Sequence, residues 1–115
     1  MSEPASAVTT HVLDAARGRP AAGVPVVLQA RTGTGWRVLA EARTDADGRV
    51  RQLGPARLAA GVYRLVFDTD AYFTATATTG FYPEVSVTFR IGDPGGHHHV
   101  PVLLSPFAFS TYRGS

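Results

Sequence analysis

Apolar and polar residues alternate along most of this chain, a pattern typical of β-strands that bury one face. Val24, Val26 and Leu28 fall on one face of the first clear segment, and the residues between them fall on the other. Gly-Thr-Gly at 33–35 then interrupts the pattern, and a second strand-like segment follows over 36–43. We therefore predict that these two segments form a β-hairpin joined by a loop.

Six further segments have strand patterns and lie between turn signals. With the hairpin strands at 24–30 and 36–43, the predicted strands are 9–13, 49–53, 62–67, 84–91, 98–104 and 107–112. The exception is 69–78, where an Asp or Thr cap precedes alanine and aromatic residues; this predicts one short helix that ends before Pro83. Eight short strands predict an all-β fold, a β-sandwich, over residues 8–115. Residues 1–7 are predicted to be a flexible N-terminal segment.

Composition narrows the class of protein and its partners. The 115 residues are 44% hydrophobic, which is enough for one globular domain with a single core. All 11 basic residues are arginines, but they are scattered and the net charge is +2, so we expect no nucleic-acid partner. No stretch approaches the ~20 apolar residues of a membrane span, so we expect no membrane partner. The absence of Cys excludes disulfides, and with no visible targeting signal it favours a cytoplasmic location.

The four histidines are the first candidates for chemistry, because an imidazole with a pKa of ~6.5 transfers protons near neutral pH. Strand alternation places His97 and His99 on one face and His98 on the other. A zinc site would need His11, from another strand, to join His97 and His99. That alternative stays open, as does a solvated face on an edge strand, and we predict no metal.

Arg49 and the tail are the second group of candidates. Arg49 follows a turn of Asp and Gly residues at 44–48, where a long cationic side chain can project from the start of a strand. The turn resembles the start of a calcium loop, but no Glu follows at the required distance, so we exclude calcium. Tyr112 to Ser115 follow an apolar stretch and place a free carboxylate close by, which indicates a tail that is tied into a site rather than frayed. An ordinary last strand with a solvated Arg113 is the alternative, and this segment alone does not exclude it.

Five blocks of the sequence carry a family resemblance. They are Thr-Thr-His-Val-Leu-Asp at 9–14 with the Gly- and Pro-rich stretch at 18–26, Thr-Asp-Ala-Asp-Gly-Arg at 44–49, Phe-Tyr-Pro-Glu-Val at 81–85, His-His-His-Val-Pro-Val-Leu-Leu-Ser-Pro at 97–106, and Tyr-Arg-Gly-Ser at 112–115. Together they resemble the signatures of the transthyretin-like family over nearly the whole chain. The last block marks the enzymatic branch of that family and is missing from the hormone-carrying branch.

The resemblance implies a prealbumin-type, transthyretin-like sandwich of two four-stranded sheets with one short helix. It implies a homotetramer with sites at the dimer–dimer interface. It also implies hydrolysis of 5-hydroxyisourate to 2-oxo-4-hydroxy-4-carboxy-5-ureidoimidazoline in urate breakdown, with no metal or organic cofactor. By position, the implied catalytic residues are His11, Arg49 and His99, and the implied substrate-binding residues are His11, Arg49, Tyr112, Arg113 and Ser115. His98 stands where the family usually has Tyr, which leaves open whether His97 or His99 is the catalytic histidine.

The residue types suit such a reaction. Opening a cyclic amide requires a base that takes a proton from water, and a neutral histidine is suited to that task. Arg49 can hold the substrate through two hydrogen bonds and stabilise negative charge on the carbonyl oxygen. Either His11 or His99 would be the base, and the sequence does not rank them. The alternative is a small-ligand carrier of transthyretin type, which binds a planar ligand in the intersubunit channel without chemistry; a non-catalytic adhesion module is a third interpretation.

Overall fold

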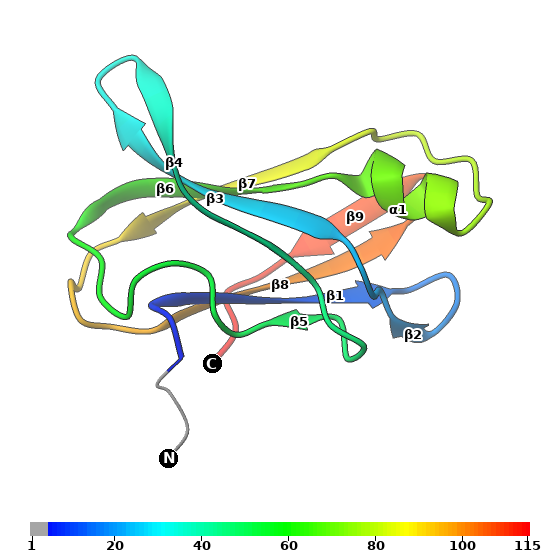
Figure 1. Cartoon of the computed structure of the whole chain (residues 1–115), viewed down its shortest axis with the longest axis horizontal. Coiled ribbons are helices and arrows are strands. Elements are labelled where there is room, and N and C mark those ends of the chain that lie inside the picture. Colours follow the sequence, from blue (N-terminus) through cyan, green and yellow to red (C-terminus); the bar gives the residue numbers. More distant parts are fainter. Residues whose placement is uncertain (1–4) are drawn as a thin grey trace.

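The computed structural model describes residues 5–115, which form two β-sheets packed face to face and one short helix (Figure 1). The β3 sheet is antiparallel, and its strands in spatial order are β4 (Gly35–Arg43), β3 (Pro25–Thr32), β6 (Gly61–Phe67) and β7 (Val85–Ile91). The β1 sheet consists of β2 (Arg19–Pro20), β1 (Val8–Asp14), β8 (His98–Ser105) and β9 (Ala108–Thr111), with β5 (Arg49–Val50) also paired to β1. The predicted all-β sandwich is confirmed.

The core lies between the sheets and is built from the residues that alternate inward along each strand. Val12 and Val102 from the β1 sheet face Leu28 and Leu65 from the β3 sheet, and all four are at most 2% exposed. Burying an aliphatic side chain of this size stabilises a fold by about 1.5–3 kcal/mol. His11 and His99 occupy outward positions of the β1 sheet and are only partly buried, so both remain available for chemistry.

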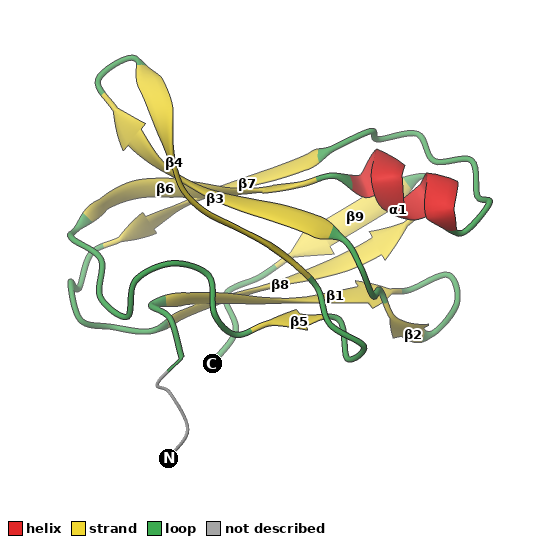
Figure 2. Ribbon diagram, in the orientation of Figure 1, coloured by secondary structure: helices red, strands yellow, loops and turns green. Residues whose placement is uncertain are grey.

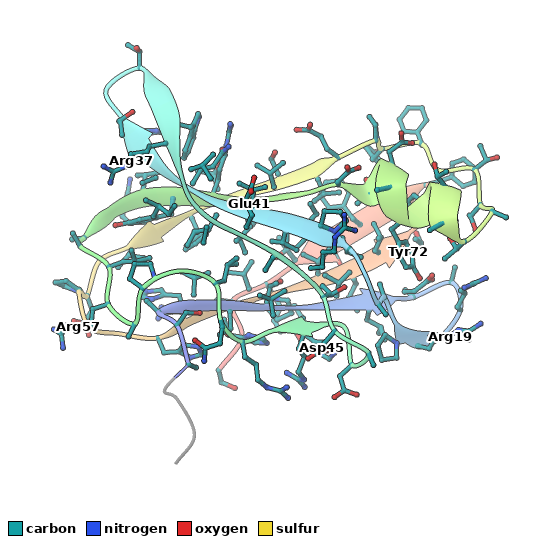
Figure 3. All side chains as sticks on the ribbon, in the orientation of Figure 1. Arg19, Arg37, Glu41, Asp45, Arg57 and Tyr72 are labelled. Carbon is teal, nitrogen blue, oxygen red and sulfur yellow. The ribbon has the colours of Figure 1, made fainter. Side chains whose placement is uncertain are left out.

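The helix α1 (Thr69–Ala75) closes one end of the sandwich, as Figure 2 shows in red. The Asp68 carboxylate caps it by accepting a hydrogen bond from the backbone N–H of Ala71 at 3.0 Å. Its buried Tyr72, labelled in Figure 3, donates a hydrogen bond to Asp14 Oδ2 at 2.7 Å and so ties the helix to the end of β1. The predicted helix is confirmed, although it stops at Ala75. Over residues 5–115 no helix has both the length and the apolar character needed to cross a membrane.

The β1 sheet differs from the prediction at two short strands, β5, which is shorter than predicted, and β2, which was not predicted. The strand predicted at 49–53 ends at Val50, because Ser6 takes over the pairing: its N–H donates to Arg51 O at 3.1 Å and its Oγ accepts from Leu53 N–H at 2.8 Å. The two-residue strand β2 was not predicted, since Arg19–Pro20 is too short to show a period. With β2 added, the β1 sheet has five strands rather than the four expected.

The predicted flexible segment at 1–7 falls partly on residues 1–4, which lie outside the described residues. Ser6 and Ala7 are both buried, and the N–H of Ala7 donates to Pro55 O at 2.9 Å. The packed part of the chain therefore includes these two residues ahead of β1.

Strand register brings distant parts of the sequence together on the outer face of the β1 sheet. The parallel pairing of β1 with β8 sets Thr9 opposite His99. The antiparallel pairing of β1 with β5 sets His11 opposite Arg49. Figure 1 shows the C-terminal end of the chain on the outer side of the same sheet. These pairings position the candidate site.

Candidate active site

A cavity of about 250 Å³ lies where β1, β5, β8 and the chain's last residue meet. Its lining residues are Ala5, Thr9, Thr10, Arg49, Val50, Arg51, His97, His99 and Ser115. Among residues 5–115, the lining comprises two imidazoles, two guanidinium groups, the hydroxyl-bearing residues Thr9, Thr10 and Ser115, and no Asp or Glu side chain. It is therefore suited to a small anionic or strongly polar ligand rather than an apolar one.

The turn before β5 positions Arg49. One carboxylate oxygen of Asp45, labelled in Figure 3, accepts hydrogen bonds from the N–H groups of Asp47 and Arg49, both at 2.9 Å. The bond from Arg49 is the main reason that the pKa of Asp45 is lowered. Gly48 has a φ of 76°, the left-handed conformation that glycine adopts without strain. This turn starts β5 so that Arg49 reaches the cavity.

His97 and His99 share one hydroxyl partner. Thr9 Oγ1 lies 3.0 Å from His97 Nε2 and 2.8 Å from His99 Nδ1, both within hydrogen-bonding distance. The two rings are nearly parallel, with an interplanar angle of 18° and centroids 6.5 Å apart. The predicted alternation is confirmed, because His98 points the other way and is buried. The structure does not leave His99 on an open sheet edge, since β1 pairs with it on one side and the isolated bridge to Gly114 covers the other.

The electrostatic surroundings of His99 favour its neutral form. Partial burial is the main cause that lowers its pKa below the usual 6.5, and the positive charge of Arg49 lowers it further. Smaller contributions come from His97 and His11, and a hydrogen bond to the backbone of Thr9 opposes them. His99 is therefore unprotonated at neutral pH and can accept a proton.

His11 borders this group without lining the cavity. It lies opposite Arg49 in the β1–β5 pairing, it is partly buried, and its charge lowers the pKa of His99. Three of the residues predicted to form the site, Arg49, His99 and Ser115, line one cavity. His11 joins them as a near neighbour.

The tail passes directly over His99. The N–H of Gly114 donates to the carbonyl oxygen of His99 at 2.8 Å, and the two residues form an isolated β-bridge. A Cβ added to Gly114 would lie 2.5 Å from Cδ2 of the His99 ring, so only glycine fits there without displacement. The predicted attachment of the tail to the site is thus present at Gly114 and Ser115.

Tyr112 and Arg113 lie elsewhere. They line a second cavity, of about 340 Å³, between the edges of β7 and β9; its other lining residues are Val87, Phe89, Arg90, His98, His99, Val100 and Thr111. His99 is the residue common to both cavities. Within one protomer the structure therefore separates Tyr112 and Arg113 from the cavity that holds Arg49.

Two further observations concern ligands. Among residues 5–115, no group of three or more His, Cys, Asp or Glu side chains is arranged to hold a metal ion. Thr9 was not predicted as a site residue, although its position on the same strand face as His11 was visible in the sequence. Its role depends on the pairing of β1 with β8, which the sequence pattern does not reveal.

Known proteins resemble this chain over nearly its whole length. The HIUase/Transthyretin family matches residues 8–114, and the chain belongs to that family. It is 46% identical over 114 residues to a 5-hydroxyisourate hydrolase of Caulobacter vibrioides, covering 96% of this chain and 99% of the relative.

Solved structures agree with this assignment. The structure of Klebsiella pneumoniae 5-hydroxyisourate hydrolase matches with a TM-score of 0.84 at 38% identity, covering 94% of this chain and 98% of the other. Transthyretin from Sparus aurata matches with a TM-score of 0.86 at 35% identity, covering 93% and 95%. The fold is thus common to a hydrolase and to transthyretin, and function must be argued from the site.

Proposed function

We propose that this chain is an enzyme that hydrolyses 5-hydroxyisourate to 2-oxo-4-hydroxy-4-carboxy-5-ureidoimidazoline. The observation that carries the proposal is the cavity itself, in which a neutral imidazole lies beside Arg49 in a family whose relatives include 5-hydroxyisourate hydrolases. A base and an anion-binding group in one cavity are what hydrolysis of a cyclic amide requires.

In the proposed mechanism His99 is the base. Its lowered pKa keeps the ring neutral at physiological pH, so it can take a proton from the attacking water. A positioned general base of this kind contributes about 10²–10⁴-fold to the rate. His11, partly buried beside Arg49, would orient the substrate or deliver a proton to the leaving nitrogen.

Arg49 would bind the substrate and stabilise the transition state. Its planar guanidinium can donate two parallel hydrogen bonds to a carbonyl or enolate edge. The same charge would stabilise the oxyanion that forms when water attacks the acyl carbon. Ser115 lines the cavity and would contact the substrate directly. Tyr112 and Arg113 would contact the substrate from the adjoining cavity, which His99 also lines.

We also propose that the active form is a homotetramer with its sites at the dimer–dimer interface. Three exposed apolar side chains lie on two neighbouring strands and their turn: Leu103 on β8 (37% exposed), Phe107 in the turn (69%) and Phe109 on β9 (39%). The Phe109 ring also contacts the Tyr82 ring, which is 36% exposed, and exposed apolar side chains that contact one another mark interaction surfaces. Light scattering coupled to size-exclusion chromatography should give four times the 12.2 kDa mass of one chain, and a monomer mass would contradict the proposal.

Generating the substrate in place tests the reaction. Urate oxidase would convert urate to 5-hydroxyisourate in the cuvette, and the ultraviolet absorbance of that product would be followed with and without this chain. Faster decay with the chain supports the proposal, and an unchanged spontaneous rate refutes it. Heat-denatured protein at the same concentration controls for non-specific effects.

A carrier function is the second candidate, since the fold also matches a structure of sea bream transthyretin in complex with thyroxine. The lining of the 250 Å³ cavity argues against an apolar ligand, because His97, His99, Arg49 and Arg51 contribute to it. Titration calorimetry with thyroxine distinguishes the two functions. Tight thyroxine binding without hydrolysis of 5-hydroxyisourate would favour the carrier.

A further inference from the structure

Thr9 makes a pair of contacts that the proposed mechanism has not used. Its side chain is only 6% exposed, and its Oγ1 lies 2.8 Å from His99 Nδ1 and 3.0 Å from His97 Nε2. The parallel pairing of β1 with β8 sets Thr9 directly opposite His99, so the sheet itself maintains the contact. The hydroxyl therefore bridges two histidines in a position that solvent barely reaches.

A threonine hydroxyl has one proton to donate, and this limits the protonation states of its partners. Thr9 can donate to one neutral histidine only, so it must accept a hydrogen bond from the other. The three groups then form a series of hydrogen bonds in which all donors point the same way. If His99 donates from Nδ1, Thr9 donates onward to His97 Nε2. If His97 donates from Nε2 instead, Thr9 donates to His99 Nδ1, and His99 carries its own proton on Nε2.

The proposed function selects between these two directions. A histidine that takes a proton from water needs a free lone pair on the nitrogen that faces the water. His99 Nδ1 is occupied by Thr9, so the reacting nitrogen is Nε2, and the ring proton must sit on Nδ1. A neutral histidine is held in one tautomer by the hydrogen bond that its other nitrogen makes.

We propose that Thr9 is a positioning residue that fixes His99 as the Nδ1–H tautomer and leaves Nε2 free to act as the base. In the same series of hydrogen bonds the Thr9 hydroxyl donates to His97 Nε2, so His97 keeps its own proton on Nδ1. His97 thus acts as the acceptor that orients the hydroxyl. This role rests on the proposed hydrolysis for its importance, but the tautomer itself is a property of the free protein.

Nitrogen-15 NMR of the wild-type chain, labelled at histidine, tests the tautomer without substrate. At a pH above the His99 titration, Nδ1 of His99 should show the shift of a protonated ring nitrogen and Nε2 that of an unprotonated one. In Thr9→Val, which removes the hydroxyl but keeps the shape, the two shifts should move toward the mixture found in free histidine. A wild-type His99 that carries its proton on Nε2 overturns the proposal.

Kinetics supply the second test. Thr9→Val should lower kcat by about 10- to 100-fold, the range found when a group that orients a metal-bound histidine is removed, while KM changes little. Thr9→Ser retains the hydroxyl and should restore most of the wild-type kcat. A role in packing alone predicts the opposite order, with wild-type kcat in Thr9→Val, which keeps the shape, and that result would refute the proposal.

Thr44→Val is the matched control. Thr44 is as buried as Thr9, at 4% exposed, and its hydroxyl also makes two hydrogen bonds, to Ala21 O at 2.6 Å and from Val24 N–H at 2.8 Å. It lies outside the cavity, so this variant should lose stability but keep kcat. If the wild-type chain itself fails to hydrolyse 5-hydroxyisourate, the proposed function fails, whereas the NMR result still decides the tautomer.

Discussion

Replacing Gly114 with alanine tests whether the tail and the His99 ring hold each other in place. The new Cβ would lie 2.5 Å from Cδ2 of His99, and 3.2 Å from both Cγ of His99 and Cγ of Pro101. Carbon atoms in contact are normally about 3.5–4.0 Å apart, so something must move by roughly 1 Å. Pro101 is buried in β8, so the movement falls on the tail or on the imidazole.

A displacement of that size has a predictable kinetic effect. Misplacing a catalytic group by about 1 Å can cost 10²-fold in rate, so we expect Gly114→Ala to lower kcat/KM by about 100-fold. The assay is the ultraviolet decay of 5-hydroxyisourate generated from urate by urate oxidase. The thermal unfolding midpoint should change little, because Gly114 lies outside the hydrophobic core.

Gly92→Ala is the control for this prediction. No atom lies within 4 Å of a Cβ added at Gly92, so kcat/KM should stay within about twofold of the wild type. If Gly114→Ala keeps wild-type activity as well, the tail does not hold the His99 ring and that part of the account is wrong.

Two further predictions concern protonation. In Arg49→Gln, the midpoint of the His99 titration followed by NMR should rise toward 6.5, because Arg49 is the second cause of its lowered pKa; an unchanged midpoint would contradict the placement of Arg49. Burial and the bond to Asp14 raise the pKa of Tyr72 from 10.0 to about 12, so its contribution to stability is complete below pH 10 and is lost as the pH rises toward 12. The urea-derived unfolding free energy of the wild type should therefore fall over that range by about 2 kcal/mol more than that of Tyr72→Phe. Equal slopes in the two proteins would contradict it.

The sequence predicted the fold where local pattern determines it. Inward residues such as Leu28 and Leu65 follow a period of two that any strand must show, and Asp68 is a recognisable helix cap. The end of β5 at Val50 was not predictable, because it depends on Ser6, which lies far away in the sequence. Local pattern does not reveal which distant segments pair.

In the site, too, some residues were visible in the sequence and others depended on the pairing of distant strands. His99, Arg49 and Ser115 were predicted, and the structure brings them into one cavity. Thr9 was missed, because its contact with His99 spans 90 positions and depends on strand register. Tyr112 was expected beside them, but it follows the end of β9 and faces the second cavity. The predicted cytoplasmic location stays a prediction.

The most direct measurement compares kcat/KM for 5-hydroxyisourate in the wild type and in His99→Asn, with circular dichroism to verify that both are folded. Asparagine can still hydrogen-bond to Thr9 but cannot accept a proton from water at neutral pH. The account predicts a loss of at least about 100-fold in the variant, the lower limit for a positioned general base. A folded His99→Asn variant with wild-type kcat/KM would show that another group activates the water, and would contradict the account at its centre.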